Sequence, residues 1–434
     1  MTAIVSKQIR VNNAGNFRDD VGTDSTYLYI GRSQAWPSSD TAIATPVDTV
    51  FDKNNVHQNM IALKKVAQSD VSHCITRYNW LSGTTYVAYD DQLDTLSTSQ
   101  YYVITDELNV YKCLQAGTGA SVVKPTGQTT NAANAVESDG YVWKFMATLS
   151  GTQATKFLTN SFVPVNIITS NDGSLQFDVQ TNAQNGSIHR VKISAGGSGY
   201  TSTPTVTITG DGSSATAAAT VVGGVVTGIT MSNIGTGYNQ AVVTITGGGG
   251  TGATARAIIS PPGGHGANMA DELGAFFVMC NINLDSDEGS GDFPIDNDFR
   301  QLGLIRNPFN FGTTTAATAS TLQATRSLVY ASLAGGSFAV DEIITGGTSG
   351  AKAYVTSIDT GTSTIRYHQD DTTGFGTFQS SETISNVSSV TATISSLGNP
   401  EVEKFSGEVL YIENRSAVAR ANSQIEDIKL VLEF

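Results

Sequence analysis

The sequence predicts a mainly β, multidomain protein with a few helices, in which a discontinuous base domain is interrupted by two small inserted β modules. Three observations lead to this prediction. The chain has 44 glycines, abundant Thr and Ser, and only 14% charged residues, a composition that favours strands and turns over helices. Residues 186–258 contain an internal repeat of short strand-like runs. In residues 428–434, Ile, Leu, Leu and Phe alternate with Lys, Val and Glu, which predicts a closing strand with one apolar face.

Length and charge limit the possible functions. A chain of 434 residues is long enough for two to four domains. It has 24 Lys and Arg against 38 Asp and Glu, a net charge of −14. An acidic surface repels phosphate, so we expect no nucleic-acid partner. A surface poor in charge and rich in Thr and Ser suits a protein that stays in contact with neighbouring subunits.

The cysteines and the N-terminus favour a reducing compartment and no membrane association. Cys74, Cys113 and Cys280 are odd in number, far apart and without Cys-x-x-Cys spacing, which predicts free buried thiols. Residues 1–10 lack the apolar core of a signal peptide. No apolar run approaches the roughly 18 residues that a membrane-spanning helix needs.

The first part of the base domain, residues 1–165, is the least repetitive stretch and contains all three tryptophans. Residues 26–33 read as a strand that enters a turn. An Asn cap and apolar residues at helical spacing predict a helix over residues 54–67. The remaining strong patterns are three strand-like segments at residues 101–105, 109–114 and 139–145.

Residues 186–258 form the first predicted insert. Residues 188–200 align with residues 226–238 at an offset of 38, and Thr-Ile-Thr-Gly recurs at 207–210 and 244–247. One copy alone can bury little apolar surface, so two copies facing each other predict a small β domain.

A second, weaker repeat predicts another β module at residues 320–397, where Phe338 and Phe378 begin related segments. Residues 266–312 return to ordinary sequence with a strand at 275–282 and continue the base domain, and residues 399–434 close it. Inserted modules are tolerated best at exposed loop tips.

Catalytic motifs are not found in the sequence. It has no Gly-x-Ser-x-Gly elbow and no Walker-type loop, and the glycine run at 247–252 lies inside a β repeat without a following helix, which indicates a turn. The five histidines are scattered singly, so we expect no catalytic residue, metal site or cofactor. They are His57, His73, His189, His265 and His368.

Two further patterns leave alternatives open. Residues 285–292 cluster carboxylates, the oxygen ligands that Ca²⁺ prefers, but Ser290 and Asp296 depart from an EF-hand loop, so a solvated acidic loop is favoured. Exposed tyrosines would permit carbohydrate stacking, whereas strand packing or subunit contact is the plainer interpretation. These tyrosines are Tyr86, Tyr89, Tyr101, Tyr102 and Tyr111.

Six short motif pieces, in order, resemble the dimeric baseplate wedge subunit of T4-like contractile-tailed phages. They are Gly-Arg-Ser followed by Trp, Arg-x-x-Trp, Tyr-x-Cys-Leu, Asp-Gly-Tyr-Val-Trp, Phe-Arg-Gln ending in Asn-Pro, and the closing strands. The residues concerned are Gly31, Arg32, Ser33, Trp36, Trp80, Tyr111, Cys113, Gly140, Tyr141, Trp143, Phe299, Arg300, Gln301, Asn307, Pro308, Ser406, Gly407, Glu408, Tyr411, Glu413, Asn414, Arg415 and Phe434.

The resemblance implies a structural, non-enzymatic homodimer that joins other baseplate wedge proteins in the virion tail after synthesis in the host cytoplasm. Such a subunit takes part in baseplate assembly and in its rearrangement on host contact, and its own contact with the host surface is at most indirect. The pieces are packing and turn residues. Glu408 and Arg415 are candidates for an ion pair or for backbone contacts at an interface, with a plain solvent-exposed pair as the alternative. The two inserts depart from the family pattern, so their neighbours are not predicted.

Two other classes of function compete with this expectation. The repeats at 186–258 favour a tail-associated protein that binds host glycans, which a glycan array would distinguish. An enzyme such as a glycosidase with a carboxylate pair has no support from any motif.

Overall fold

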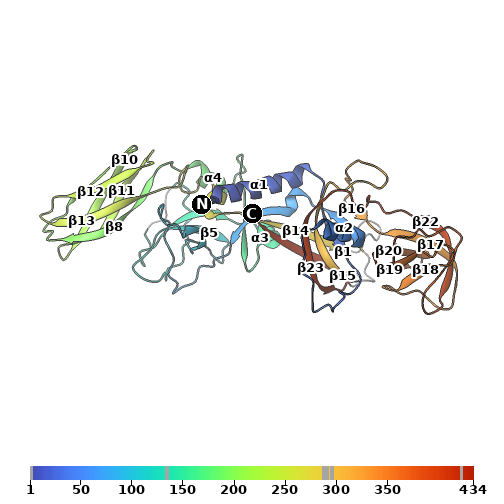
Figure 1. The fold of residues 1–434 in the computed structure, drawn as a ribbon. Helices are drawn as coiled ribbons and strands as arrows, with labels where there is room; N and C mark the ends of the chain where they lie inside the picture. Colours follow the sequence, from blue (N-terminus) through green and yellow to red (C-terminus); the bar gives the residue numbers. More distant parts are fainter. Residues whose placement is uncertain (1–2, 132–135, 286–292, 294–297, 421–423) are drawn as a thin grey trace. The chain divides into compact units, whose positions relative to one another are not determined.

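The computed structural model describes residues 3–131, 136–285, 293, 298–420 and 424–434. Over these residues the protein is mainly β, with 43% strand and 13% helix. The strands form several separate sheets (Figure 1). This confirms the predicted mainly β, multidomain fold class. All three cysteines are free and buried, as predicted. Within the described residues, no helix has both the length and the apolar character needed to cross a membrane.

The chain divides into two compact units, each assembled from segments that are distant in sequence. Unit 1 comprises Met1–Asn16, Ser72–Met279 and Val431–Phe434, and unit 2 comprises Phe17–Val71 and Cys280–Leu430. The residues predicted to form one base domain are therefore shared between the two units, whereas each predicted insert lies inside one of them.

An antiparallel sheet of five strands, in the order β16-β2-β1-β15-β23, lies at the centre of unit 2. Its middle strand β1 is buried along its whole length because it pairs on both sides and carries apolar or aromatic residues on both faces. Tyr29 lies opposite Gly303, and its hydroxyl donates to the Tyr411 carbonyl at 3.1 Å. The strands are β1 (Thr26–Gly31), β2 (Met60–Lys65), β15 (Phe299–Arg306), β16 (Thr321–Gln323) and β23 (Glu408–Val418).

The helix predicted over residues 54–67 is wrong in its second half. Helix α2 (Val50–Asn59) begins after Thr49, whose hydroxyl caps it, so the predicted cap Asn54 lies inside the helix. Residues Met60–Lys65 form β2 instead, because β1 and β16 supply backbone partners on both sides. Pairing with distant strands thus overrides the local helical spacing.

A long helix near the N-terminus was not predicted. Helix α1 (Lys7–Thr23) is largely polar, and its buried apolar residues are Val11, Ala14 and Val21. So few apolar positions produce almost no amphipathic signal, which explains why the sequence pattern missed the helix.

Unit 1 contains a three-stranded sheet in the order β4-β5-β6 that corresponds to the strands predicted between residues 101 and 145. The third strand begins later than predicted, at Val142. A second sheet has the order β24-β14-β3-β7, and its strands β14 and β24 cross the boundary between the units along the chain. In β24, Ile428 and Leu430 are buried and alternate with more exposed residues, as predicted.

These elements have the following bounds: β3 (Val71–Thr76), β4 (Tyr102–Ile104), β5 (Asn109–Gln115), β6 (Val142–Thr148), β7 (Phe162–Val165), β14 (Phe277–Asp285), β24 (Ile425–Glu433), α3 (Gly151–Phe157), α4 (Leu175–Thr181) and α5 (Met269–Leu273), with single 3₁₀ turns at Gln68–Asp70 and Leu96–Thr98.

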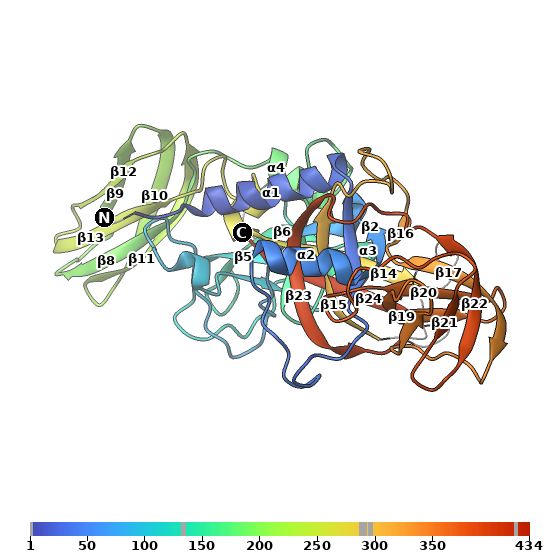
Figure 2. The same cartoon turned by 45° about the vertical axis from the view of Figure 1, so that its right-hand side comes forward.

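The strands of the first repeat interlock (Figure 2). Strand β8 of the first copy pairs with β13 of the second, while the equivalent strand β11 of the second copy pairs with β10 of the first. Tyr200 packs on Gly250 of the other copy, and Tyr238 packs on Gly212 in the same way. Each copy therefore completes the other. The strands are β8 (Ile188–Ser198), β9 (Thr205–Gly210), β10 (Ser213–Val222), β11 (Val225–Thr236), β12 (Ala241–Thr246) and β13 (Thr251–Ile259).

The second repeat forms a closed barrel in the order β17-β20-β19-β18-β21-β22. Phe338 and Phe378, which begin the two copies, are both buried in its core. Glu342 accepts a hydrogen bond from the Asn386 amide of the other copy at 2.7 Å, and Glu382 accepts one from the Ser349 backbone at 2.8 Å. The strands are β17 (Arg326–Ala334), β18 (Ile343–Gly346), β19 (Lys352–Asp359), β20 (Thr364–His368), β21 (Thr383–Ser385) and β22 (Thr391–Gly398).

We predict that Gly212→Ala and Gly250→Ala each lower the free energy of unfolding by about 1–3 kcal/mol. A methyl group at either position would lie 2.5 Å from the Cγ atom of the tyrosine packed on it. Urea unfolding of the full chain measures the effect. Gly151→Ala is the matched control, because no heavy atom lies within 4 Å of its added methyl. Equal stability of all three variants would contradict the interlocked packing.

Candidate functional site

The motif residues separate into two groups, one in each unit. Neither group converges on a reactive centre. Unit 2 contains Gly31, Arg32, Ser33, Trp36, Phe299, Arg300, Gln301, Asn307, Pro308, Ser406, Gly407, Glu408, Tyr411, Glu413, Asn414 and Arg415, and unit 1 contains Trp80, Tyr111, Cys113, Gly140, Tyr141, Trp143 and Phe434.

In unit 2 the motif residues connect β1, β15 and β23. The Trp36 indole N–H donates to the Arg415 carbonyl at 2.8 Å, and the Arg32 guanidinium lies 4.2 Å from the centre of the Trp36 ring. The Gln301 amide donates to Asn414 at 2.8 Å. These contacts join residues up to 379 positions apart in the chain. They hold the sheet together.

Arg300 anchors the loop that follows β1. Its guanidinium donates to both carboxylate oxygens of Asp40, at 2.8 and 2.9 Å, and to the Ser33 carbonyl. The hydrogen bond from Arg300 lowers the pKa of the Asp40 carboxyl below its ordinary value. This bidentate arrangement fixes the geometry of the loop.

The suggested pairing of Glu408 with Arg415 is wrong. Glu408 pairs with Arg306 at 2.6 Å on the neighbouring strand, and Arg415 pairs with Glu413 at 3.1 Å on its own strand. All of these side chains are partly exposed, so each ion pair contributes little to stability.

In unit 1 the motif residues form an aromatic core. Tyr141 and Trp143 stack with ring centres 5.7 Å apart, and Tyr111 and Cys113 are fully buried beside them. The Trp80 indole donates to Ser121 at 3.2 Å. The five tyrosines considered for carbohydrate stacking are all buried, which confirms the packing interpretation.

Two other motif residues of unit 1 shape the backbone. Gly140 adopts a φ of +85°, which favours glycine, in the turn before β6. Phe434 at the C-terminus donates its backbone N–H to the Phe276 carbonyl at 3.1 Å, and its own carbonyl accepts from Arg10. The chain end is thereby held in place.

A buried ionic cluster in unit 1 was not predicted. The Lys112 ammonium donates to Glu272 at 2.6 Å and to His265 at 2.9 Å, and it lies 4.2 Å from the Tyr89 ring centre. Burial lowers the pKa of Lys112, and Glu272 partly offsets this effect. The Glu272 carboxylate also accepts from the Gly266 backbone at 2.6 Å. Because these groups are buried and mutually satisfied, the cluster positions β5 against the segment before α5.

We predict that Glu272→Gln lowers the free energy of unfolding by about 3–5 kcal/mol, since it leaves the Lys112 ammonium buried without a counter-charge. The double variant Lys112→Met/Glu272→Gln recovers much of this loss, because the new amide oxygen still accepts from Gly266. Glu433→Gln, which breaks the exposed pair with Arg10, is the control and changes stability by less than about 1 kcal/mol. Urea denaturation measures all three, and equal losses in the single and double variants would contradict this interpretation.

Two of the five histidines lie close together in the fold. The rings of His189 and His265 lie 5.0 Å apart in unit 1, a proximity that sequence spacing did not predict. Burial lowers the pKa of His189 to about 4, so its ring is neutral at pH 7. Within the described ranges, no group of three or more His, Cys, Asp or Glu side chains is placed to hold a metal ion. Most of the acidic segment 285–292 lies outside the described residues.

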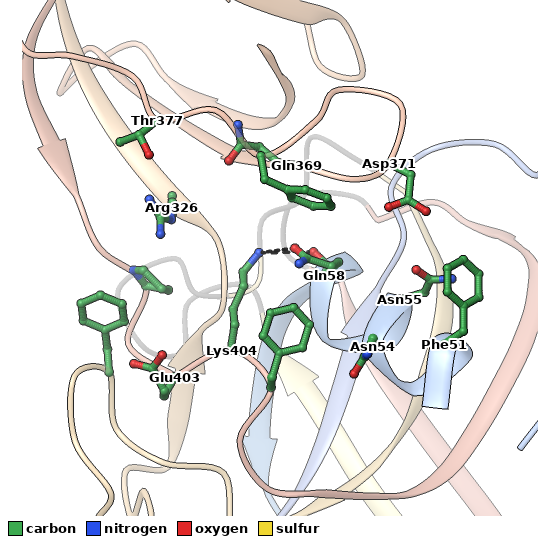
Figure 3. Close-up of a pocket in the computed structure, with 14 residues that line it drawn as sticks. Phe51, Asn54, Asn55, Gln58, Arg326, Gln369, Asp371, Thr377, Glu403 and Lys404 are labelled. Carbon is green, nitrogen blue, oxygen red and sulfur yellow. Dashed lines mark hydrogen bonds between the residues drawn. The ribbon is translucent and has the colours of Figure 1, made fainter. Parts of the chain in front are cut away.

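A candidate binding site among the described residues is a groove in unit 2 with a volume of about 590 Å³ (Figure 3), within the range of ligand pockets. We call it the aromatic groove and define it by Phe51, Phe311, Phe375, Phe405, Arg326 and Lys404. Helix α2, the loop after β20 and the turn at residues 403–407 supply most of its lining.

Large aromatic rings of the groove face solvent. Phe51 is 63% exposed, Phe375 57% and Phe405 53%. Phe405 also has a φ of +63°, a left-handed conformation that is costly for a bulky side chain. A strained backbone and an exposed aromatic ring both lower the stability of the folded protein. Strained residues of this kind cluster at functional sites. This combination favours the groove as a contact surface.

The cations of the groove lack acidic partners. Lys404 reaches the Gln58 side chain at 3.3 Å (Figure 3). Burial, followed by the neighbouring Arg326 guanidinium, lowers the pKa of Lys404 to about 8. Among the described side chains, no carboxylate forms an ion pair with Lys404 or Arg326. The carboxylate of Glu403 is engaged by the Gly312 backbone N–H at 2.8 Å.

Sequence reasoning did not identify this groove. Phe51, Arg326, Phe375 and Lys404 come from segments far apart in the chain, so no local spacing connects them. The available local signal was Phe-Ser-Gly at 405–407, where an aromatic residue stands two positions before a glycine.

We predict that Phe405→Gly leaves the free energy of unfolding unchanged or raises it by up to about 1 kcal/mol, because glycine adopts positive φ without strain. Phe375→Gly is the matched control, since its ring is similarly exposed but its φ is not positive. It is expected to lower stability by about 0.5–1 kcal/mol. Thermal or urea unfolding compares the two, and a clear loss for Phe405→Gly would contradict the assigned strain.

Comparison of the sequence with protein-family models and with curated proteins found no match.

Proposed function

We propose that this chain is a structural subunit of a phage tail baseplate wedge. It would link wedge proteins, take part in baseplate assembly, and rearrange with the baseplate on host contact. It would act as a homodimer without catalysis, and its place would be the virion tail after synthesis in the host cytoplasm. The proposal starts from the resemblance of six ordered motif pieces to the dimeric wedge subunit of T4-like phages.

The strongest support for the proposal is that the motif residues contact one another in the folded chain. Trp36 bonds to Arg415, Gln301 bonds to Asn414, and Tyr141 stacks on Trp143. The pieces that resemble one family in sequence therefore pack together and stabilise the sheets. This is what a scaffold needs, because a scaffold transmits force through rigid packed elements and switches at its interfaces.

The glycan-binding alternative loses its main support in the repeat module. Residues 186–258 contain two tyrosines, Tyr200 and Tyr238, and no Phe or Trp. Both tyrosines are buried. The module therefore offers no exposed ring of these types for stacking on a sugar. A glycan array probed with the full chain is expected to show no binding, and a specific sugar hit would favour the alternative.

Electron microscopy of virions labelled with gold-conjugated antibody against the chain tests the proposed role. We expect label at the distal end of the contractile tail. Virions preincubated with antibody that has been absorbed with the purified chain provide the control. Label on fibres away from the baseplate, or no label on intact or disrupted virions, would contradict the proposal.

A further inference from the structure

Lys404 lies in a position that calls for an anionic ligand. It is partly buried, its neighbours include the Arg326 guanidinium and the His57 and His368 rings, and its hydrogen bonds go to the uncharged Gln58. A partly buried cation without a counter-charge has lost hydration that no ion pair replaces. Two carboxylates, Asp371 and Glu403, also line the groove. Among the described residues neither of them pairs with Lys404 or Arg326, so both cations are available to the carboxylate of a ligand.

The rest of the aromatic groove fits a peptide. Phe51, Phe375 and Phe405 present exposed rings for an apolar side chain. Asn54 and Asn55 also line the groove, and amide side chains both donate to and accept from peptide backbone. Aromatic residues together with arginine are enriched where proteins contact one another, and cationic clusters recognise acidic motifs.

We propose that the aromatic groove binds an acidic peptide segment of a partner protein, whose carboxylate is held by Lys404 and Arg326 and whose flanking apolar side chain packs on Phe51, Phe375 and Phe405. The inference does not depend on the baseplate role, because it is drawn from the groove alone.

The test uses fluorescence anisotropy with the full chain and the fluorescein-labelled peptide Gly-Ser-Phe-Glu-Phe-Ser-Gly-amide. The same peptide with Gln in place of Glu removes the charge and keeps the shape. We expect the Glu peptide to bind at least about tenfold more tightly, as a charged hydrogen bond in a partly buried site provides. No binding of the Glu peptide at millimolar concentration, or equal binding of both peptides, overturns the proposal.

Variants assign the interaction to the groove. Lys404→Met and Arg326→Met are each expected to weaken the Glu peptide about tenfold or more and to leave the Gln peptide nearly unchanged. Lys404 is partly buried and has no acidic partner among the described residues, so its removal leaves no counter-charge without a partner. We therefore expect Lys404→Met to remain folded, and thermal unfolding checks this. Lys352→Met, at the exposed first position of β19 and outside the groove lining, is the control. Wild-type affinity in Lys404→Met overturns the proposal.

Proton uptake on peptide binding distinguishes direct contact of Lys404 with the ligand from a purely structural role, which would cause no uptake. A bound carboxylate raises the pKa of Lys404 from about 8, so binding at pH 8.5 takes up protons and binding at pH 6.5 does not. The other titratable groups around it are Arg326, His57, His368, Glu403 and Asp371, and burial keeps the histidines neutral at both values. Calorimetry in two buffers of different ionisation enthalpy measures the uptake, and its absence overturns the assigned role of Lys404.

A sugar acid is the competing ligand. N-acetylneuraminic acid carries a carboxylate without a peptide backbone. Displacement of the labelled peptide by this sugar at lower concentration than by unlabelled Glu peptide would assign the groove to acidic glycans and overturn the peptide proposal. Failure of the sugar to compete supports it.

Discussion

Backbone pairing between strands from distant parts of the chain is the constraint on which the rest of the structure depends. Strand β1 pairs with β2 and with β15, and β15 begins about 270 residues later in the sequence. Strand β23 then pairs with the outer edge of β15. Each buried backbone N–H and C=O needs such a partner. The Trp36, Arg300 and Gln301 side-chain bonds strengthen a sheet whose order is already set by this pairing.

The same constraint explains the two repeat modules. A single copy of either repeat has strands without partners, so the copies exchange them: β8 with β13 and β11 with β10 in the first module, and a closed barrel in the second. Glycine is required where a tyrosine of one copy lies on the backbone of the other. The turn at 403–407 is a different case, because there a bulky residue, Phe405, and not a glycine adopts the positive φ.

Local patterns were predictable from the sequence, whereas pairing between distant segments was not. Period-two alternation in residues 428–434, the turns before strands, and the two internal repeats are local patterns, and they predicted the mainly β fold class. Strand β2 was mistaken for helix because a strand buried on both faces has no period of two. Helix α1 was missed because it is largely polar. Sequence spacing does not reveal contacts that form only in the assembled fold. Examples are the contact of Trp36 with Arg415 and the convergence of Phe51, Arg326 and Lys404.

We propose that this chain is a dimeric structural subunit, and its mass in solution tests the proposal most directly. Light scattering of the purified full-length chain, measured over a range of concentrations at physiological salt, is expected to give twice the 45.5 kDa chain mass. Dimers usually form through a two-fold contact, which closes and does not grow further. A mass of one chain at every concentration would contradict the account.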